Sequence, residues 1–142
     1  MRVVELTADQ THALRRAVLR RADPEANVVF ECDQDPATFH LGVIEDGVVV
    51  ATSTWIPAPP SAQLRGMAVE PSRQGDGLAT GLLQGAYERL RALGVEQLWA
   101  YARDTALSFY TRAGFAVVGD GFVTADTGLP HHLVTLSLDL EK

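Results

Sequence analysis

A glycine-rich turn between a predicted strand and a predicted helix is the stretch of this sequence best suited to chemistry. The strand is expected over residues 61–71, Gly75 and Gly77 lie in the turn, and the helix is expected over residues 77–93. The first N–H groups of a helix have no intrahelical partner, and the helix dipole favours negative charge beside them. Glycines also let a phosphate approach the backbone closely. The turn indicates an anion site, although a strand-to-helix turn without a ligand would explain the two glycines equally well.

The composition limits the classes of protein to which the chain can belong. Of its 142 residues, 46% are hydrophobic and 21% are charged, so we expect one globular domain over residues 1–142. The net charge of −6 argues against nucleic acid or an anionic membrane as the partner. The single cysteine, Cys32, excludes an intramolecular disulfide and a cysteine metal cluster. The chain starts without a secretory signal and has no apolar run long enough to span a membrane, so a cytoplasmic location is expected.

Further strands and helices must position the glycine turn. Thr7 and Gln10 predict a capping box before a helix that runs to about Arg21, and Asp46-Gly47 predicts a β-hairpin, because both residues accept a positive φ. Strands are expected over residues 2–6, 39–46, 48–57, 61–71, 95–102, 115–124 and 131–140, and a third helix over 104–114. This order predicts an α/β fold with a mixed, mostly antiparallel sheet, unlike the regular alternation of a Rossmann domain.

Three segments together resemble the GNAT acetyltransferase superfamily. Gln74-Gly75-Asp76-Gly77-Leu78-Ala79 fits the family signature Q/R-x-x-G-x-G/A. Residues 67–71, Met-Ala-Val-Glu-Pro, are similar to the end of the family's fourth strand. Residues 104–115 are similar to its second motif, Asn-x-x-Ala-x-x-Phe-Tyr-x-x-x-Gly-Phe. Each segment alone is a weak signal, but their order and spacing are specific, and the resemblance covers nearly the whole chain.

The resemblance implies a GNAT-like central sheet with helices on both faces and a gap where two neighbouring strands, residues 64–70 and 95–102, splay apart. Acetyl-CoA would bind in this gap as the co-substrate. The backbone of Met67, Ala68 and Val69 would pair with the pantetheine arm like an added strand. The pyrophosphate would be held by the turn and the start of the helix, that is by Gln74, Gly75, Asp76, Gly77, Leu78, Ala79 and Thr80.

Two acidic residues depart from the family pattern. Asp76 stands where many members have a basic or neutral residue, and a carboxylate close to a pyrophosphate costs affinity unless it points to solvent. Asp104 replaces the usual Asn that contacts the pantetheine arm, and a role as a helix N-cap would explain it on its own. These departures keep a non-catalytic acyl-CoA-binding sensor or regulatory module open as the alternative to an N-acetyltransferase.

The implied reaction is direct attack of a primary amine on the acetyl thioester. A backbone N–H at a bulge in strand 64–70, near Ala68 or Val69, is expected to stabilise the oxyanion. Tyr110 occupies the position of the family's general acid, and a half-buried helix tyrosine is the simpler alternative for it. The amine must also lose a proton, and candidate bases are His40, Glu70, His131 and His132. His131 and His132 point to opposite faces of an extended strand, so at most one can reach a given site.

Two shorter matches resemble one branch of the superfamily. They are Leu-Arg-Gly-Met-Ala at residues 64–68 and Gly-Leu-Pro-His at residues 128–131. We interpret His40, Arg65 and one of His131 or His132 as walls of the acceptor pocket, and an arginine there suggests an acceptor that carries a carboxylate. The acceptor would be a small-molecule or peptide amine. A homodimer is compatible with such a fold, because its C-terminal strands often pair between subunits.

The remaining polar and aromatic candidates have simple structural interpretations. Glu31, Asp33 and Asp35 are interpreted as a solvated acidic loop, and no metal is expected, because their spacing lacks the Gly and Glu of a calcium loop. Cys32 has no flanking base and is interpreted as a small apolar filler. Trp55 is expected in the core or, alternatively, at the acceptor cleft.

Overall fold

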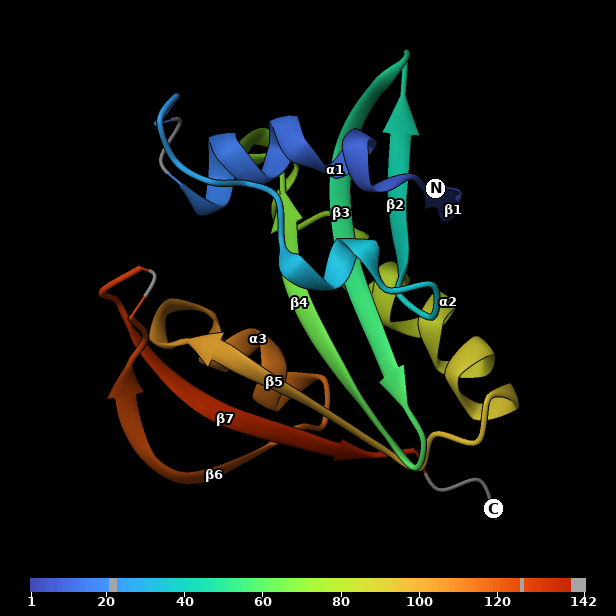
Figure 1. The fold of residues 1–142 in the computed structure, drawn as a ribbon, viewed down its shortest axis with the longest axis vertical. Helices are drawn as coiled ribbons and strands as arrows, with labels where there is room; N and C mark the ends of the chain where they lie inside the picture. Colours follow the sequence, from blue (N-terminus) through green and yellow to red (C-terminus); the bar gives the residue numbers. More distant parts are fainter. Residues whose placement is uncertain (21–22, 126, 139–142) are drawn as a thin grey trace.

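One seven-stranded sheet forms the centre of the protein. The computed structural model describes residues 1–20, 23–125 and 127–138, and its strands follow the order β1-β2-β3-β4-β5-β7-β6 (Figure 1). The strands are β1 (Val4–Leu6), β2 (Phe39–Glu45), β3 (Val48–Ala58), β4 (Ser61–Val69), β5 (Gln97–Arg103), β6 (Ala116–Val123) and β7 (Pro130–Ser137). Neighbouring strands are antiparallel except β4 and β5, which run parallel. The expected mixed, mostly antiparallel sheet is confirmed.

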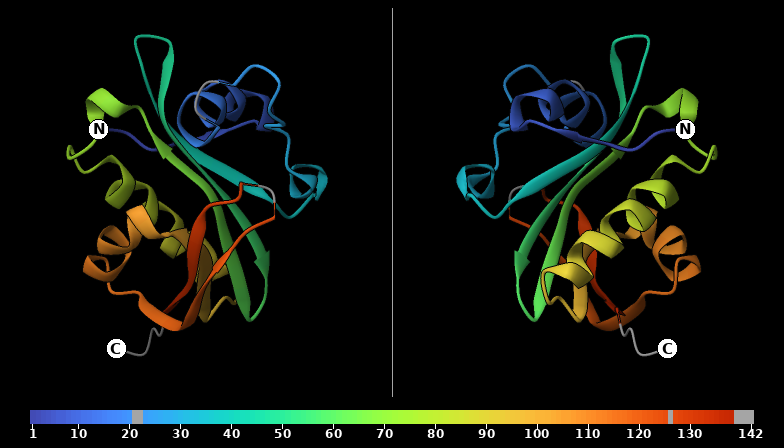
Figure 2. Two further views of the ribbon diagram at one scale, coloured as in Figure 1. Left: turned by 90° about the vertical axis from the view of Figure 1, so that its left-hand side faces the viewer. Right: turned by 90° about the vertical axis from the view of Figure 1, so that its right-hand side faces the viewer.

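Helices cover both faces of this sheet, as expected. They are α1 (Ala8–Leu14), α2 (Leu78–Ala92) and α3 (Leu107–Arg112), together with the short turns η1 (Arg15–Leu19), η2 (Glu31–Gln34), η3 (Pro71–Arg73) and η4 (Asp104–Ala106). Figure 2 shows α1 and η1 on one face of the sheet and α2 and α3 on the other. None of the helices in the described ranges is long and apolar enough to cross a membrane.

The main core lies between the sheet and α2. The buried side chains of α2 recur at helical spacing and are Leu78, Leu82, Leu83, Ala86 and Leu90. Burial of each leucine stabilises the fold by about 1.5–3 kcal/mol. Trp55 is fully buried, stacks on Phe39 and donates its indole N–H to Ser53, so it belongs to the core and does not line the acceptor cleft.

The parallel contact between β4 and β5 is short. It comprises three residue pairs, from Ser61↔Gln97 to Gln63↔Trp99. Beyond Gln63 the two strands diverge, and Figure 1 shows them meeting at one end and spreading apart at the other. The splayed strand pair expected from the sequence is therefore present, and it leaves the backbone of β4 from Leu64 onwards without a strand partner on that side.

Two local predictions are confirmed and two are corrected. The Thr7–Gln10 capping box forms, and Asp46 (φ 52°) and Gly47 (φ 78°) make the hairpin turn. The first helix is shorter than expected, because α1 ends at Leu14 and continues only as a π-helical turn. The strand expected over residues 61–71 is shorter than expected, because β4 ends at Val69 and η3 begins at Pro71.

A buried ion pair connects η1 and η2 to the sheet. Arg15 donates from Nη1 and Nη2 to the two carboxylate oxygens of Asp33, at 2.8 and 3.0 Å, and both side chains are 1% exposed. Arg15 also donates to the Val28 carbonyl at 2.7 Å and to the Thr54 hydroxyl on β3 at 2.9 Å. The interpretation of Asp33 as a solvated loop residue is wrong, because its carboxylate balances a buried guanidinium.

Replacement of Asp33 by Asn should destabilise the fold. Asn keeps the volume but leaves Arg15 as an unbalanced buried charge, and we expect a loss of about 3–5 kcal/mol in the free energy of unfolding, measured by chemical denaturation at pH 7. Glu31→Gln, at an exposed position of the same turn, should change stability by less than about 0.5 kcal/mol.

The same pair should make stability dependent on pH. Burial raises the pKa of Asp33, but the hydrogen bonds from Arg15 and from the Phe30 N–H, with the Arg15 charge, outweigh it and hold the pKa below its usual value. The unfolded chain, with a pKa of about 3.9, therefore takes up the proton first. The stabilisation should be complete above about pH 5 and be lost as the pH falls through the lowered pKa. An equal acid sensitivity of Asp33→Asn and the unaltered protein would contradict this assignment.

Candidate active site

A cavity of about 350 Å³ opens where β4 and β5 separate. Met67 on β4, Ala102 on β5 and Tyr110 on α3 line it, together with η1, Phe30 and the segment that leads into β7. The volume is near the lower end of the range of roughly 300–1,000 Å³ that is usual for small-molecule sites. Of the sequence-predicted residues, the structure brings Arg65, Met67, Tyr110 and His131 together at this cavity.

Tyr110 is a buried tyrosine in the wall of this cavity. Its side chain is 6% exposed and is held edge-on between Phe109 and Phe115, with ring centroids 5.2 Å away on each side. Burial raises the pKa of Tyr110 above its usual value. The phenol is therefore protonated at neutral pH and can donate to an anion that develops in the cavity.

His131 is the candidate base that lines the cavity. Its Nδ1 lies 2.8 Å from the Leu129 carbonyl, which can only accept, so Nδ1 carries the proton. In the neutral ring, Nε2 therefore keeps a free lone pair. Phe122 stacks on the imidazole with centroids 6.2 Å apart and fixes the orientation of the ring. His131 thus has the tautomer that a proton acceptor requires.

The other three candidate bases lie outside the cavity lining. His40 is buried with Nδ1 2.8 Å from the Thr54 hydroxyl and Nε2 3.8 Å from Asp33, and burial lowers its pKa. Glu70 is occupied in capping η3, because it accepts from the backbone N–H and hydroxyl of Ser72.

His132 faces away from His131, as strand geometry requires. Its Nδ1 lies 2.7 Å from the carboxylate of Asp104. The predicted N-cap role of Asp104 is wrong, because Arg103 precedes η4, Ala106 precedes α3, and neither helical segment has a side-chain cap. Asp104 and His132 instead join the start of η4 to β7.

Three arginines line the cavity on a protein that is acidic overall. Arg65 comes from β4, whereas Arg20 and Arg103, which the sequence analysis did not single out, come from the end of η1 and the end of β5. Arg103 donates to the Leu19 carbonyl at 2.7 Å, and Arg20 donates to the Asn27 carbonyl at 3.4 Å. The recorded hydrogen-bond contact of the Arg65 guanidinium is to Cys32 Sγ at 4.0 Å, and sulfur is a weak acceptor. At Arg65 the cavity is therefore suited to an anionic group.

The glycine turn has the features of an anion site at the start of α2. Gly75 (φ 90°) and Gly77 (φ 82°) have backbone conformations that favour glycine, and added Cβ atoms would have no neighbour within 4 Å. The first intrahelical hydrogen bond runs from the Gly81 N–H to the Gly77 carbonyl at 3.0 Å. The N–H groups of residues 78–80 precede that bond and are left for a ligand.

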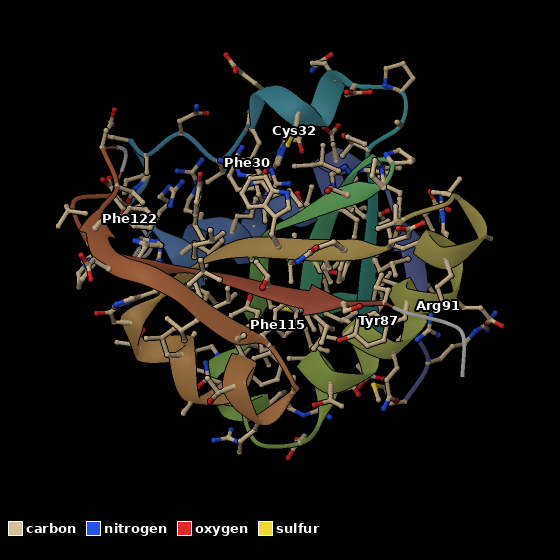
Figure 3. All side chains as sticks on the ribbon, turned by 90° about the horizontal axis from the view of Figure 1, so that it is seen from below. Phe30, Cys32, Tyr87, Arg91, Phe115 and Phe122 are labelled. Atoms are coloured by element: carbon tan, nitrogen blue, oxygen red, sulfur yellow. The ribbon has the colours of Figure 1, made fainter. Side chains whose placement is uncertain are left out.

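A second hollow of about 320 Å³ continues from this turn between α2 and α3. Thr80, Gln84 and Tyr87 of α2 line one side of it, and Phe109 and Arg112 of α3 line the other. Figure 3 shows Tyr87 and Phe115 on the α2 side of the sheet, and Phe30 and Cys32 on the other side. The hollow between α2 and α3 and the Phe30 wall of the arginine-lined cavity thus lie on opposite sides of the sheet.

Asp76 is paired with a neighbouring cation. It accepts from Arg73 Nε at 2.8 Å, and Arg73 also forms an ion pair with Glu45 at the end of β2. These hydrogen bonds, first to Asp76 and then to Glu45, raise the pKa of Arg73, so the guanidinium stays charged. Because Asp76 is half-exposed and paired, its cost to a nearby pyrophosphate is reduced.

The bulge expected in β4 is present, but earlier than predicted. The register against β3 shifts between Thr52↔Ala68 and Thr54↔Arg65, so Gly66 and Met67 both face Ser53. Gly66 has φ 64°, which favours glycine. A bulge changes the direction of backbone N–H groups beside the gap, where a developing negative charge would need a donor.

Comparison with known proteins identifies the family and the fold. The model of the acetyltransferase (GNAT) family matches residues 4–115. The chain belongs to this family. A curated relative, the uncharacterized N-acetyltransferase YitI of Bacillus subtilis (strain 168), is 24% identical over 141 residues, with 94% of this chain and 93% of the relative covered.

Solved structures share the fold of this GNAT protein at low identity. An aminoglycoside 6'-N-acetyltransferase complexed with coenzyme A has a TM-score of 0.81 at 14% identity, covering 100% of this chain and 99% of that one. The ribosomal-protein-S18-alanine N-acetyltransferase from Escherichia coli has a TM-score of 0.78 at 20% identity, with 99% and 96% covered. As a GNAT member, the protein is an acetyl-CoA-dependent N-acetyltransferase. Neither the family match nor the cavity favours the non-catalytic alternative.

Substitution of Gly77 tests the anion site at α2. Gly77→Glu places a carboxylate at the helix N-terminus, and Gly77→Gln introduces the same backbone strain without the charge. We expect Gly77→Glu to bind coenzyme A about 10- to 100-fold more weakly than Gly77→Gln in isothermal titration, because like charges a few ångströms apart repel. Equal affinity of the two variants would place the pyrophosphate elsewhere.

Proposed function

We propose that this enzyme transfers the acetyl group of acetyl-CoA to the primary amine of a small acceptor that carries an anionic group. The observation that supports this most directly is the cavity beside the β4–β5 gap. It combines a protonated Tyr110, a His131 whose neutral ring has a free lone pair on Nε2, and Arg65, whose recorded hydrogen-bond contact is only to the sulfur of Cys32.

Residues of β4 and α2 are suited to hold the cofactor. Bound acetyl-CoA supplies a thioester whose carbonyl an amine can attack. We assign its pantetheine arm to the unpaired edge of β4 at Met67, Ala68 and Val69. We assign its pyrophosphate to the turn and helix start, that is to Gln74, Gly75, Asp76, Gly77, Leu78, Ala79 and Thr80. Asp104 lies within hydrogen-bond distance of His132. We assign it to the pantetheine arm on the basis of the family motif alone.

Two side chains are assigned to proton transfer. His131 accepts a proton from the acceptor's ammonium group at Nε2, directly or through water, which leaves the neutral nucleophilic amine. Backbone N–H groups at the Gly66–Met67 bulge polarise the thioester carbonyl during attack. Tyr110 then donates its phenolic proton to the sulfur as the C–S bond breaks, and the proton that the nitrogen of the new amide releases restores the phenol.

Arginines determine which amines enter. Guanidinium groups bind carboxylates and phosphates through paired hydrogen bonds, whereas they repel a simple cationic amine. Arg65 is therefore assigned to the acceptor's anionic group. His40 is not assigned to the acceptor pocket, because it lies outside the cavity lining and contacts Thr54 and Asp33.

Three broader assignments rest on the sequence. Residues 1–142 act as a single acetyltransferase domain, and the enzyme works in the cytoplasm, where acetyl-CoA is available. We also assign the enzyme to the branch of the superfamily that residues 64–68 and 128–131 resemble in sequence.

Removal of the Tyr110 hydroxyl tests the acid. Tyr110→Phe keeps the ring between Phe109 and Phe115. We expect kcat to fall by about 100-fold or more, with the Kd for coenzyme A changed by less than about threefold, because the proton is needed only as the thiolate leaves. Unchanged turnover in steady-state assays would remove Tyr110 from the chemistry.

Matched acceptors test the anionic group. Amino acids and small amines bearing a phosphate should have kcat/KM at least about tenfold above the corresponding amides or uncharged amines, because a charge-assisted hydrogen bond contributes about 1.5–3 kcal/mol. Arg65→Gln should reduce this preference, and Arg2→Gln, an exposed arginine near the N-terminus, should leave it unchanged. Equal kcat/KM for acid and amide in the unaltered enzyme would overturn the acceptor class.

A further inference from the structure

Phe30 forms part of the acceptor cavity wall from outside the sheet. It precedes η2, is 7% exposed and lines the cavity beside Arg65. Figure 3 shows it next to Cys32, beneath the segment that crosses this face of the sheet. Its ring contacts two guanidinium groups, with the Arg15 Cζ 3.7 Å and the Arg65 Cζ 4.4 Å from the ring centroid.

Buried contacts fix the position of Phe30. Its backbone N–H donates to Asp33 Oδ2 at 3.0 Å, the same oxygen that accepts from Arg15 at 2.8 Å. Arg15 in turn stacks on the Phe30 ring. Both the backbone and the ring of Phe30 are therefore tied to one buried ion pair, which gives the ring a defined place at the cavity.

Arg65 has no comparable polar anchor among the described residues. The hydrogen-bond contact recorded for its guanidinium is to Cys32 Sγ at 4.0 Å, and sulfur is a weak acceptor. A long side chain with weak polar contacts samples many rotamers, and each of these is lost on binding. The stack on Phe30 restricts this freedom and leaves the planar N–H edge of the guanidinium available to an anion.

The approach of the ring to β4 depends on Gly66. A Cβ at that position would lie 2.9 Å from Phe30 Cε2, closer than carbon atoms tolerate. The glycine in the β4 bulge therefore lets the ring of Phe30 pack against β4 beside Arg65.

We propose that Phe30 is a positioning residue that orients Arg65 toward the anionic group of the acceptor, with the Arg15–Asp33 pair holding the ring in place. This inference rests on the proposed function, because it takes the cavity as the acceptor site. Phe30 touches neither thioester nor amine in this assignment and acts through Arg65.

The test compares Phe30→Leu with Phe30→Tyr, using one amino acid and its amide as acceptors. Leu fills the site without a ring face, and Tyr keeps the face. We expect Phe30→Leu to raise KM for the amino acid by about tenfold, to leave KM for the amide within about twofold and to leave the Kd for coenzyme A unchanged. Phe30→Tyr should retain the KM of the unaltered enzyme for both acceptors.

Thermal unfolding separates positioning from a purely structural role. A lower melting temperature of Phe30→Leu with an unchanged amino acid-to-amide ratio of KM would overturn the proposal. So would equal increases of KM for both acceptors. If Phe30→Leu does not fold, Arg65→Lys takes its place, because it keeps the charge but lacks the planar face, and an unaltered amino acid KM in that variant would equally overturn the proposal. A lack of preference for the amino acid in the unaltered enzyme would instead refute the proposed acceptor class.

Discussion

The parallel ladder between β4 and β5 ends after three residue pairs, and the arrangement of the active site depends on this early end. A strand edge without a partner leaves N–H and C=O groups that need hydrogen bonds. In this protein those groups face an opening into which Tyr110 and the β4 bulge both extend. The helix N-terminus on one face and the arginine-lined cavity on the other can therefore serve a single reaction through the sheet.

A buried ion pair holds the face of the sheet that carries η1 and η2, whereas apolar packing holds the face that carries α2. On the α2 face, leucines bury the helix against the strands. On the opposite face, residues 23–38 contain only the short turn η2, and Asp33 fastens this segment to Arg15 and, through Arg15, to Thr54 of β3. A buried ion pair requires one specific geometry, since any displacement exposes its desolvation cost. That requirement suits a wall whose shape determines which acceptor fits.

Sequence patterns predicted the elements well, because their signals are local. The Asp46-Gly47 hairpin, the apolar stripe of α2 and the turn at Gly75 and Gly77 each depend on residues close together in the chain. The contacts of Asp33 and His40 were not predictable in this way, because their partners lie on other elements. Arg20 and Arg103 reach the cavity only because the strands splay, and no local pattern marks them. Strand alternation did predict that at most one of His131 and His132 would reach a given site, but it could not tell which one.

The arginine-lined cavity also affects the other end of a bound acceptor. In free solution, the carboxylate of an amino acid stabilises the neighbouring ammonium group and keeps the amine a weak nucleophile. When guanidinium groups neutralise that carboxylate, the stabilisation is lost, and nearby positive charge further favours loss of the ammonium proton. Recognition of the acid would in this way activate the amine. An acceptor bound by its anionic group would lose the proton of its ammonium group more readily. His131 would then need to be a less strong base to produce the neutral amine.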